Sequence, residues 1–229
     1  MIIREEDIRT AAVIGGGACD KLKNAKVAVF GVGGVGGNAV EALARAGVGR
    51  IDIFDGDTVN LSNINRQLIA LHSTVGKSKV EVMRERILDI NPDCDVRANH
   101  IFYLPENADE VDLSVYDYVV DAVDTVAAKL ELAVRAQSIG VPMIAAMGAG
   151  NKLDPTAFTV SDIYKTDTCA LARVMRRELK ARGIKHLKVV WSRELSVKTE
   201  GGVVGSMPHV PGVAGYIIAG EVIKDLIKE

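Results

Sequence analysis

Short apolar runs alternate with segments of helical periodicity along the first part of the chain. Residues 26–30 form an apolar run that glycine stops, and residues 38–46 then place apolar side chains at helical spacing. A second apolar run follows at 50–54. Strand, glycine turn, helix and strand in this order form the first half of a Rossmann-type unit, because two parallel strands need a right-handed helical crossover between them.

The same alternation continues to about residue 150. Further helices are predicted at 77–90, which Asn91-Pro92 ends, and at 125–139, and further strands at 95–99, 116–120 and 143–146. Beyond these, strands are predicted at 158–160 and 187–191, helices at 169–181 and 213–226, and a flexible loop from Gly201 to Pro211. We therefore predict an α/β fold: a Rossmann-like, mostly parallel sheet with flanking helices and a C-terminal α/β extension.

The length and composition suit one sizeable core. The chain has 229 residues, of which 48% are hydrophobic. We predict a single domain over 1–229, in which residues 1–150 bind the nucleotide. Residues 151–229 are the extension, which we expect to serve substrate binding or dimerisation.

The charge balance excludes some functions. With 28 Lys and Arg against 30 Asp and Glu, the net charge is −2, so the chain as a whole does not attract nucleic acid or an anionic membrane. Residues 173–188 differ, because they contain seven Lys or Arg and one acid. Four of these cations recur at helical spacing: Arg173, Arg176, Arg177 and Lys180. This helix face either contacts RNA phosphates or is a solvated cationic surface.

Nothing in the sequence indicates export or membrane insertion. Residues 5–7 are acidic where a signal peptide is basic, and no apolar run reaches the roughly 20 residues of a transmembrane helix. Cys19, Cys94 and Cys169 lie far apart without a Cys-x-x-Cys pair, which argues against a disulfide scaffold and a structural zinc site. We expect a cytoplasmic protein.

A glycine-rich turn follows the first predicted strand. Its glycines are Gly31, Gly33, Gly34 and Gly36. A turn of this kind between a strand and a helix lets backbone N–H groups approach a phosphate closely. A tight turn without a ligand has the same glycines, but this placement favours nucleotide binding.

Polar residues after the second strand decide which nucleotide is expected. Asp55 ends that strand, 19 residues after Gly36, where an acid accepts hydrogen bonds from a ribose, so an NAD-dependent oxidoreductase is one interpretation. The set that follows is polar and cationic: Asp57, Asn63, Arg66, Gln67 and Lys79. Two cations suit the triphosphate of ATP better, because they neutralise charge on the attacked phosphorus and on departing pyrophosphate. Taken singly, each residue also fits a solvated loop with turn-forming and capping side chains.

Asp124 follows the buried strand predicted at 116–120, at the carboxyl edge of the sheet. A carboxylate among phosphates needs a cation, and Mg²⁺ is held by one or two carboxylates together with phosphate oxygens and water. We interpret Asp124 as a magnesium ligand. The alternative is that Asp124 caps the helix predicted to begin at Thr125.

Together these residues resemble the ubiquitin-activating-enzyme-like superfamily of adenylating enzymes, which includes ThiF, HesA and MoeB. The resemblance rests on four motifs: the glycine turn, the block from Asp55 to Gln67, Val75-Gly76-x-x-Lys79, and Asp124. Within the superfamily the chain is most similar to the branch of tRNA threonylcarbamoyladenosine dehydratases. Segments that look like this branch are 41–45, 81–87, 148–156 and 162–166.

The resemblance implies ATP-dependent adenylation of a carboxylate, most closely the threonyl carboxylate of threonylcarbamoyladenosine in tRNA. The products would be the cyclic, dehydrated nucleoside, AMP and pyrophosphate. ATP and Mg²⁺ would be the cofactors, with Asp55 on the ribose, Asn63, Arg66 and Lys79 on the phosphates, and Asp124 on the metal.

The resemblance also implies a homodimer. In the superfamily an arginine near the N-terminus reaches the triphosphate bound by the partner subunit, and Arg9 is the candidate here. An exposed helix residue is the other interpretation of Arg9. The predicted catalytic residues are therefore Arg66, Lys79, Asp124 and Arg9.

The C-terminal part departs from the sulfur-transferring relatives. Those carry zinc-binding Cys-x-x-Cys pairs and an acceptor cysteine in a late crossover loop, whereas residues 196–208 contain no cysteine. The missing cysteines weigh against activation of a ubiquitin-like sulfur carrier, with a sulfur-transfer protein as partner, which is the first alternative. A non-catalytic nucleotide-binding scaffold is another. Cys169 lies at a helix start, where thiols are often reactive, but an ordinary half-buried cysteine is the simpler interpretation.

Overall fold

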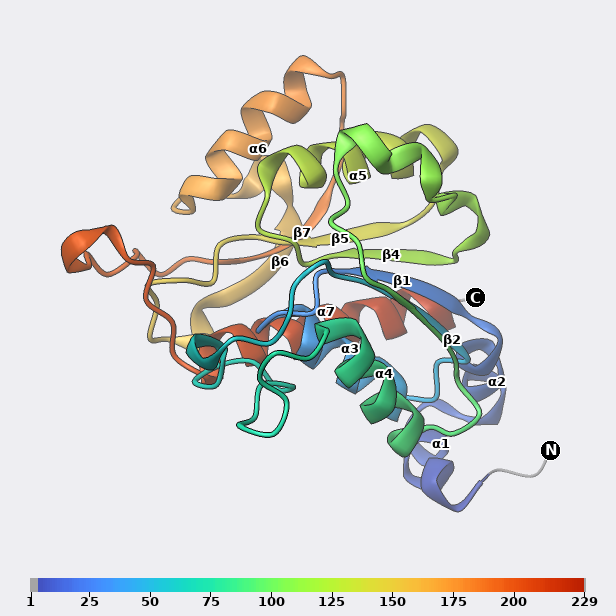
Figure 1. Cartoon of the computed structure of the whole chain (residues 1–229). Helices are drawn as coiled ribbons and strands as arrows, with labels where there is room; N and C mark the ends of the chain where they lie inside the picture. The colour runs from blue at the N-terminus through green and yellow to red at the C-terminus, as the bar shows by residue number, and fades with distance from the viewer. Residues whose placement is uncertain (1–3, 229) are drawn as a thin grey trace.

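A single seven-stranded sheet with helices on both faces organises the chain (Figure 1). The structure is a computed structural model and describes residues 4–228. The strands are β1 (Lys26–Phe30), β2 (Arg50–Phe54), β3 (Asp95–Asn99), β4 (Tyr118–Asp121), β5 (Met143–Ala146), β6 (Phe158–Asp162) and β7 (Lys188–Ser192). The helices are α1 (Ile8–Ile14), α2 (Gly16–Asn24), α3 (Gly36–Arg45), α4 (Lys79–Ile90), α5 (Val126–Ile139), α6 (Ala170–Ala181) and α7 (His209–Ile227).

The order of strands in the sheet is β3-β2-β1-β4-β5-β7-β6. All neighbouring strands are parallel except β6, which runs antiparallel to β7 at one edge. The chain moves outward from β1 to β3 and then returns to the other side of β1 with β4, so the winding direction reverses between β1 and β4. The predicted mostly parallel α/β sheet is confirmed, and β6 and β7 of the predicted extension continue the same sheet.

Two helical layers bury the sheet. Helices α3, α4 and α7 lie on one face, and α5 and α6 lie on the other (Figure 1). Val27 and Val29 of β1 belong to the core on the α3 side, whereas Ala28 and Phe30 belong to the core on the α5 side. A strand covered on both faces reads as a continuous apolar run, which is why β1 was recognisable in the sequence.

Most predicted boundaries lie within two residues of the observed ones. The sequence did not predict α1 and α2, because glycines at 15–17 interrupt their pattern. The last helix begins at His209 rather than 213, since Pro211 falls in its first turn, where a missing N–H needs no partner. The predicted flexible loop is therefore shorter, and it contains a 3₁₀ turn at Glu200–Gly202.

The C-terminal helix α7 packs on its own chain. Val210, Ala214, Ile218 and Val222 are buried in the core that includes α3. The extension at 151–229 was expected to serve substrate binding or dimerisation, and within it most apolar side chains of α7 pack inside the chain. Tyr216 of α7 is a large, partly apolar side chain that stays exposed.

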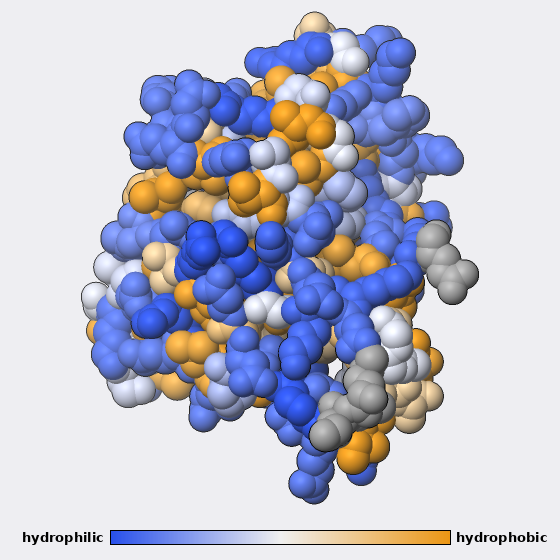
Figure 2. Space-filling model, turned by 90° about the vertical axis from the view of Figure 1, so that its right-hand side faces the viewer, coloured by the Kyte–Doolittle hydropathy of each residue, from blue (hydrophilic) through white to orange (hydrophobic). Residues whose placement is uncertain are grey.

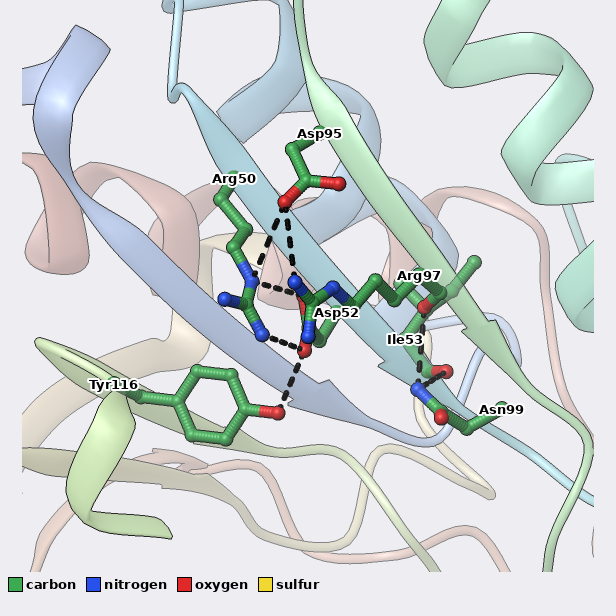
Figure 3. Close-up of polar contacts among 7 residues, drawn as sticks. All are labelled: Arg50, Asp52, Ile53, Asp95, Arg97, Asn99 and Tyr116. Carbon is green, nitrogen blue, oxygen red and sulfur yellow. Dashed lines mark hydrogen bonds and ion pairs between the residues drawn. The ribbon is translucent and has the colours of Figure 1, made fainter. Parts of the chain in front are cut away.

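A polar cluster covers one face of β2 and β3 near the amino ends of these strands (Figure 3). The carboxylate of Asp52 accepts hydrogen bonds from Arg50 at 2.8 and 2.7 Å and from the hydroxyl of Tyr116 at 2.7 Å. Asp95 of edge strand β3 lies 3.8 Å from Arg50 and 3.6 Å from Arg97. Charged side chains on an edge strand discourage pairing with another chain.

The face of the molecule shown in Figure 2 is mostly hydrophilic, with apolar areas between the polar side chains. Over residues 4–228, no helix combines the length and apolar character needed to cross a membrane.

Gly215 marks the closest contact between α7 and α3 and gives a test of this packing. A Cβ at Gly215 would lie 2.8 Å from the Cβ of Asn38 and collide with the carbonyl oxygen of Val35. We expect Gly215→Ala to lower the free energy of unfolding by about 1–3 kcal/mol, because the helices must move apart. Gly220→Ala on the same helix is the control: nothing lies within 4 Å of its Cβ, so alanine should raise stability by up to about 1 kcal/mol. Urea unfolding measures both, and equal effects would contradict the packing argument.

Candidate functional site at the carboxyl edge of the sheet

A cleft of about 540 Å³ opens at the carboxyl ends of the parallel strands. It lies where the loops after β1 and β4 diverge, which is where open α/β sheets bind ligands. The cleft brings together these predicted site residues: Gly31, Gly33, Gly34, Asp55, Asp57, Asn63, Arg66, Gln67, Lys79 and Asp124. Gly36 and Arg9 are predicted site residues that do not line it.

The glycine turn forms the floor of the cleft between β1 and α3. Gly31 has φ +89°, and a Cβ there would lie 2.6 Å from the carbonyl oxygen of Ala122 in the loop after β4. Gly36 is the first residue of α3, and a Cβ there would collide with the carbonyl of Gly31. Gly36 therefore permits close packing of helix on strand rather than contact with a ligand.

Asp55 connects the glycine turn to the loop after β2. One carboxylate oxygen accepts a hydrogen bond from the backbone N–H of Val32 at 2.7 Å, and the other accepts from the N–H of Asp57 at 2.9 Å. These bonds orient the carboxylate without exhausting it, because each oxygen has two lone pairs. Asp55 can thus hold a ribose hydroxyl while it fixes the turn.

Two cations line the cleft, and they differ in their bonding partners. The ammonium of Lys79, buried at the start of α4, is 2.7 Å from the carboxylate of Asp57. Arg66 donates to the carbonyl oxygen of Ser62 at 2.8 Å and to the side chain of Asn65 at 2.9 Å. Within residues 4–228 no carboxylate pairs with Arg66, so its charge is available to an anion.

Two buried amides complete the polar wall. The side-chain oxygen of Asn63 accepts from the backbone N–H of Asn60 at 3.0 Å. The side-chain oxygen of Gln67 is buried and has no hydrogen-bond partner in the described part of the chain. A buried polar atom without a partner is unfavourable and is common where a ligand or water completes the site.

Asp124 is exposed at the rim of the cleft. The contact recorded for its carboxylate is a hydrogen bond from the hydroxyl of Thr125 at 3.4 Å. Helix α5 begins at Val126 with Thr125 at the N-cap position, so the alternative that Asp124 caps the helix is wrong. An exposed carboxylate at the rim of a cleft that also contains Arg66 and Lys79 fits a magnesium ion, which takes one or two carboxylates and completes its shell with phosphate oxygens and water.

The apolar end of the cleft was not found from the sequence. Phe102 and Leu104 follow β3, and Val123 follows β4. The ring of Phe102 lies over Gly56, where a Cβ would be 2.5 Å from the ring. The apolar run Ile101-Phe102-Tyr103-Leu104 directly after a predicted strand was the available signal. An apolar pocket next to Asp55 suits a purine base joined to a ribose.

A model of the ThiF family matches residues 6–229. The chain belongs to the ThiF family. It is 44% identical over 239 residues to a tRNA threonylcarbamoyladenosine dehydratase of Bacillus subtilis, with 96% of this chain and 94% of that one covered. Its fold matches that of E. coli tRNA N6-threonylcarbamoyladenosine dehydratase, TcdA, in complex with AMP, with a TM-score of 0.93, 34% identity, and 99% and 97% coverage of the two chains. The same enzyme in complex with ATP gives a TM-score of 0.90 at 34% identity, with 99% and 97% coverage. The resemblance noted from the motifs is confirmed.

Arg9, the N-terminal arginine that the ThiF-family resemblance singled out, lies far from the cleft of its own chain. It is exposed on α1. Helix α1 lies near the amino ends of the strands, whereas the cleft lies at their carboxyl ends (Figure 1). Arg9 is thus an exposed helix residue within one chain, and any contact with ATP must come from a second chain.

The late loop of this ThiF-family chain contributes to the cleft although it is short. Val204 and Ser206 line the cleft, and the loop is fixed to the end of β5 through Asn151, which has φ +57°. The side-chain oxygen of Asn151 accepts from the N–H of Gly205 at 2.5 Å, and its carbonyl accepts from the N–H of Val197 at 2.7 Å. Asparagine tolerates this left-handed conformation better than most residues.

Cys169 and the basic segment are only partly as expected. Cys169 is buried at the N-cap of α6, so it is less exposed than the half-buried cysteine that the sequence suggested. Arg173, Arg177 and Lys180 are exposed on α6, as expected for a cationic surface. Arg176 is half-buried and donates to the carbonyl oxygen of Thr166 at 2.7 Å, so it does not belong to that surface.

Substitutions of two glycines in the turn separate its structural role from its ligand-binding role. We expect Gly31→Ala to lower the free energy of unfolding by about 1–3 kcal/mol, because alanine is strained at positive φ and would push Ala122 away. At Gly33 a Cβ would meet only the side-chain nitrogen of Gln67, at 3.7 Å. Gly33→Ala should therefore unfold within about 0.5 kcal/mol of wild type but bind ATP more weakly, since its methyl group occupies the phosphate approach. Thermal unfolding and calorimetric ATP titration measure the two effects, and wild-type ATP affinity in Gly33→Ala would contradict the assignment.

Proposed function

We propose that this chain adenylates the threonyl carboxylate of threonylcarbamoyladenosine in tRNA, using ATP, and releases the cyclic, dehydrated nucleoside. The arrangement of Arg66, Lys79 and Asp124 around a glycine turn supports adenylation. A nicotinamide site has no need of two cations and a free carboxylate at this place. The similarity to tRNA threonylcarbamoyladenosine dehydratases over almost the full length of both chains supports the substrate.

In the proposed first step, an oxygen of the threonyl carboxylate attacks the α-phosphorus of ATP. The bond from this phosphorus to the bridging oxygen breaks, and pyrophosphate leaves with the electron pair. Arg66 and Lys79 stabilise the negative charge that develops on the transferring phosphoryl group and on pyrophosphate. The ammonium of Lys79 leaves the carboxylate of Asp57 and pairs with the phosphates instead, because it can pair with either anion.

In the second step, the carbamoyl group of the same nucleoside attacks the activated carbonyl carbon, a proton is lost and AMP leaves. Because both reacting groups belong to one nucleoside, the protein needs mainly to hold them in contact and exclude water. No cysteine nucleophile is required, which agrees with a late loop that contains none.

Magnesium belongs to the proposal as the counter-ion of the triphosphate. Asp124 would hold it, and Asp57 is a further carboxylate that lines the cleft. When bound, Mg²⁺ supplies neutralisation of phosphate charge.

Binding of a tRNA substrate also needs a cationic surface on the protein. The same substrate supports a cytoplasmic location for the protein. Arg173, Arg177 and Lys180 offer such a surface on α6, because phosphate contacts from Lys and Arg dominate non-specific affinity for nucleic acid. A sulfur-transfer protein as a partner, and activation of a ubiquitin-like sulfur carrier, are less favoured, since the cleft loop has no acceptor cysteine.

The experiment that tests the proposal incubates the purified protein with ATP, Mg²⁺ and tRNA that carries threonylcarbamoyladenosine. Nucleoside mass spectrometry should show the loss of one water, with AMP formed in equal amount. We expect Lys79→Met and Asp124→Asn to lower the rate by about 100-fold or more while remaining folded. Pyrophosphate exchange that appears only with a ubiquitin-like protein would replace this proposal by the sulfur-carrier alternative. Binding of NADH without AMP formation would overturn adenylation altogether.

A homodimer in which Arg9 completes the partner's cleft is the remaining part of the proposal. Ile8 and Val13, on the same helix as Arg9, are 55% and 85% exposed, which supports a protein contact at α1. We expect Arg9→Ala and Lys79→Ala each to be inactive alone and a mixture of the two to recover activity. In the mixed dimer, one cleft receives wild-type Lys79 from one chain and Arg9 from the other. Full activity of Arg9→Ala alone, or no recovery in dimers shown to exchange subunits, would contradict a role in trans.

A further inference from the structure

A fully buried ion pair lies beneath the loop that follows β4. Asp121 is the last residue of β4, and Lys129 lies on the second turn of α5. Both side chains are 0% exposed, and the ammonium of Lys129 is 2.9 Å from one carboxylate oxygen of Asp121. Neither residue lines the cleft, and the adenylation steps above do not use them.

The same pair holds the loop backbone. Lys129 also donates to the carbonyl oxygen of Val123 at 3.1 Å, and the N–H of Val123 donates to Asp121 at 3.2 Å. The ammonium therefore joins the end of β4, the middle of the loop and helix α5. Within residues 121–124, this one ammonium bonds to Asp121 and to Val123.

This loop is also the wall of the nucleotide cleft. Ala122 presses against Gly31 so closely that even a Cβ would not fit between them, and its N–H donates to the carbonyl of Phe30 at 2.8 Å. Asp124 follows at the rim, where its recorded contact is with the neighbouring Thr125. Since little else holds Asp124, the loop backbone sets where its carboxylate lies.

Stability alone is a poor explanation for this pair. Burial raises the pKa of Asp121, against the opposing effect of Lys129, so the surroundings disfavour its charged form. Its second oxygen is buried without a partner in the described part of the chain. Apolar side chains of similar size are often as stable as a buried ion pair, whereas removing one partner strands a charge. A role in geometry accounts better for its presence.

We propose that Lys129, through Asp121 and the carbonyl of Val123, is the positioning residue that aligns Asp124 with the glycine turn. This role rests on the proposed function, because it concerns the carboxylate assigned to magnesium. Lys129 touches neither ATP nor the reacting atoms, so its effect passes entirely through the loop.

Two variants separate positioning from stability. Lys129→Met leaves Asp121 buried without its counter-ion, and we expect a lower Tm. Asp121→Asn/Lys129→Met removes both charges, so the Tm should recover much of the loss. In both variants the Val123 carbonyl loses its ammonium, and the Mg²⁺ concentration for half-maximal AMP formation should rise about tenfold, the usual effect of losing a group that orients a metal ligand.

Two readouts do not depend on turnover. Hydrogen–deuterium exchange at residues 122–125 should be faster in both variants than in wild type, and electron paramagnetic resonance of Mn²⁺ added with ATP should show weaker metal binding. The matched control is Asp52→Asn, which disrupts another largely buried ion pair, with Arg50 at the amino end of β2 (Figure 3). It should lower the Tm without changing exchange at 122–125 or metal dependence.

The outcomes distinguish the two proposals. Wild-type exchange and metal dependence in the double variant would overturn the positioning role and leave adenylation untouched. A wild-type protein that forms no AMP from modified tRNA would overturn the proposed function, while the exchange measurement would still decide whether Lys129 orders the loop. Equal changes in Asp52→Asn would show that the effects are general loss of stability and would also overturn the positioning role.

Discussion

The close approach of Gly31 to Ala122 is the constraint on which the cleft depends. It occurs between β1 and β4, where the winding of the sheet reverses, and it is possible because Gly31 has no Cβ and adopts positive φ. The loops on either side must diverge from this contact, and the space between them is the cleft. Asp55 reinforces the same point from β2 through its bond to Val32. The backbone at the centre of the site is thus fixed before any nucleotide arrives.

The cations around this fixed backbone differ in whether a carboxylate pairs with them. Lys79 is already paired with Asp57, Lys129 is paired with Asp121, and Arg66 is held only by neutral oxygens. In the proposed reaction, an incoming triphosphate would therefore meet one available cation at once and a second cation after an exchange of partners. Such an arrangement keeps a buried ammonium from being stranded in the nucleotide-free protein, which would be strongly unfavourable.

The sequence predicted the sheet well because parallel strands buried on both faces are visible as apolar runs, β1 and β4 above all. It also predicted most of the polar cleft, since glycines and charged residues directly after strands converge at one edge. It could not predict that Asp57 neutralises Lys79. The chain between them is an irregular loop, and no sequence pattern tells how close such a loop brings two side chains. The roles of Phe102 and Lys129 were not predicted for a related reason. An exposed aromatic ring and a buried lysine are defined by their surroundings in the fold, which the local sequence pattern does not encode. Helices α1 and α2 were missed where glycines hide the helical period.

The attachment of the late loop to Asn151 gives the cleft two parts that are held in place in different ways. The part near β1 and β2 is made of backbone contacts and paired charges that tolerate little change. The part formed by Val204 and Ser206 is held by side chains: Asn151 accepts a hydrogen bond from the N–H of Gly205, and Asn65 donates to the carbonyl oxygen of Ser206 at 2.9 Å. A change in that loop would therefore reshape one wall of the cleft while the backbone contact between Gly31 and Ala122 stays in place.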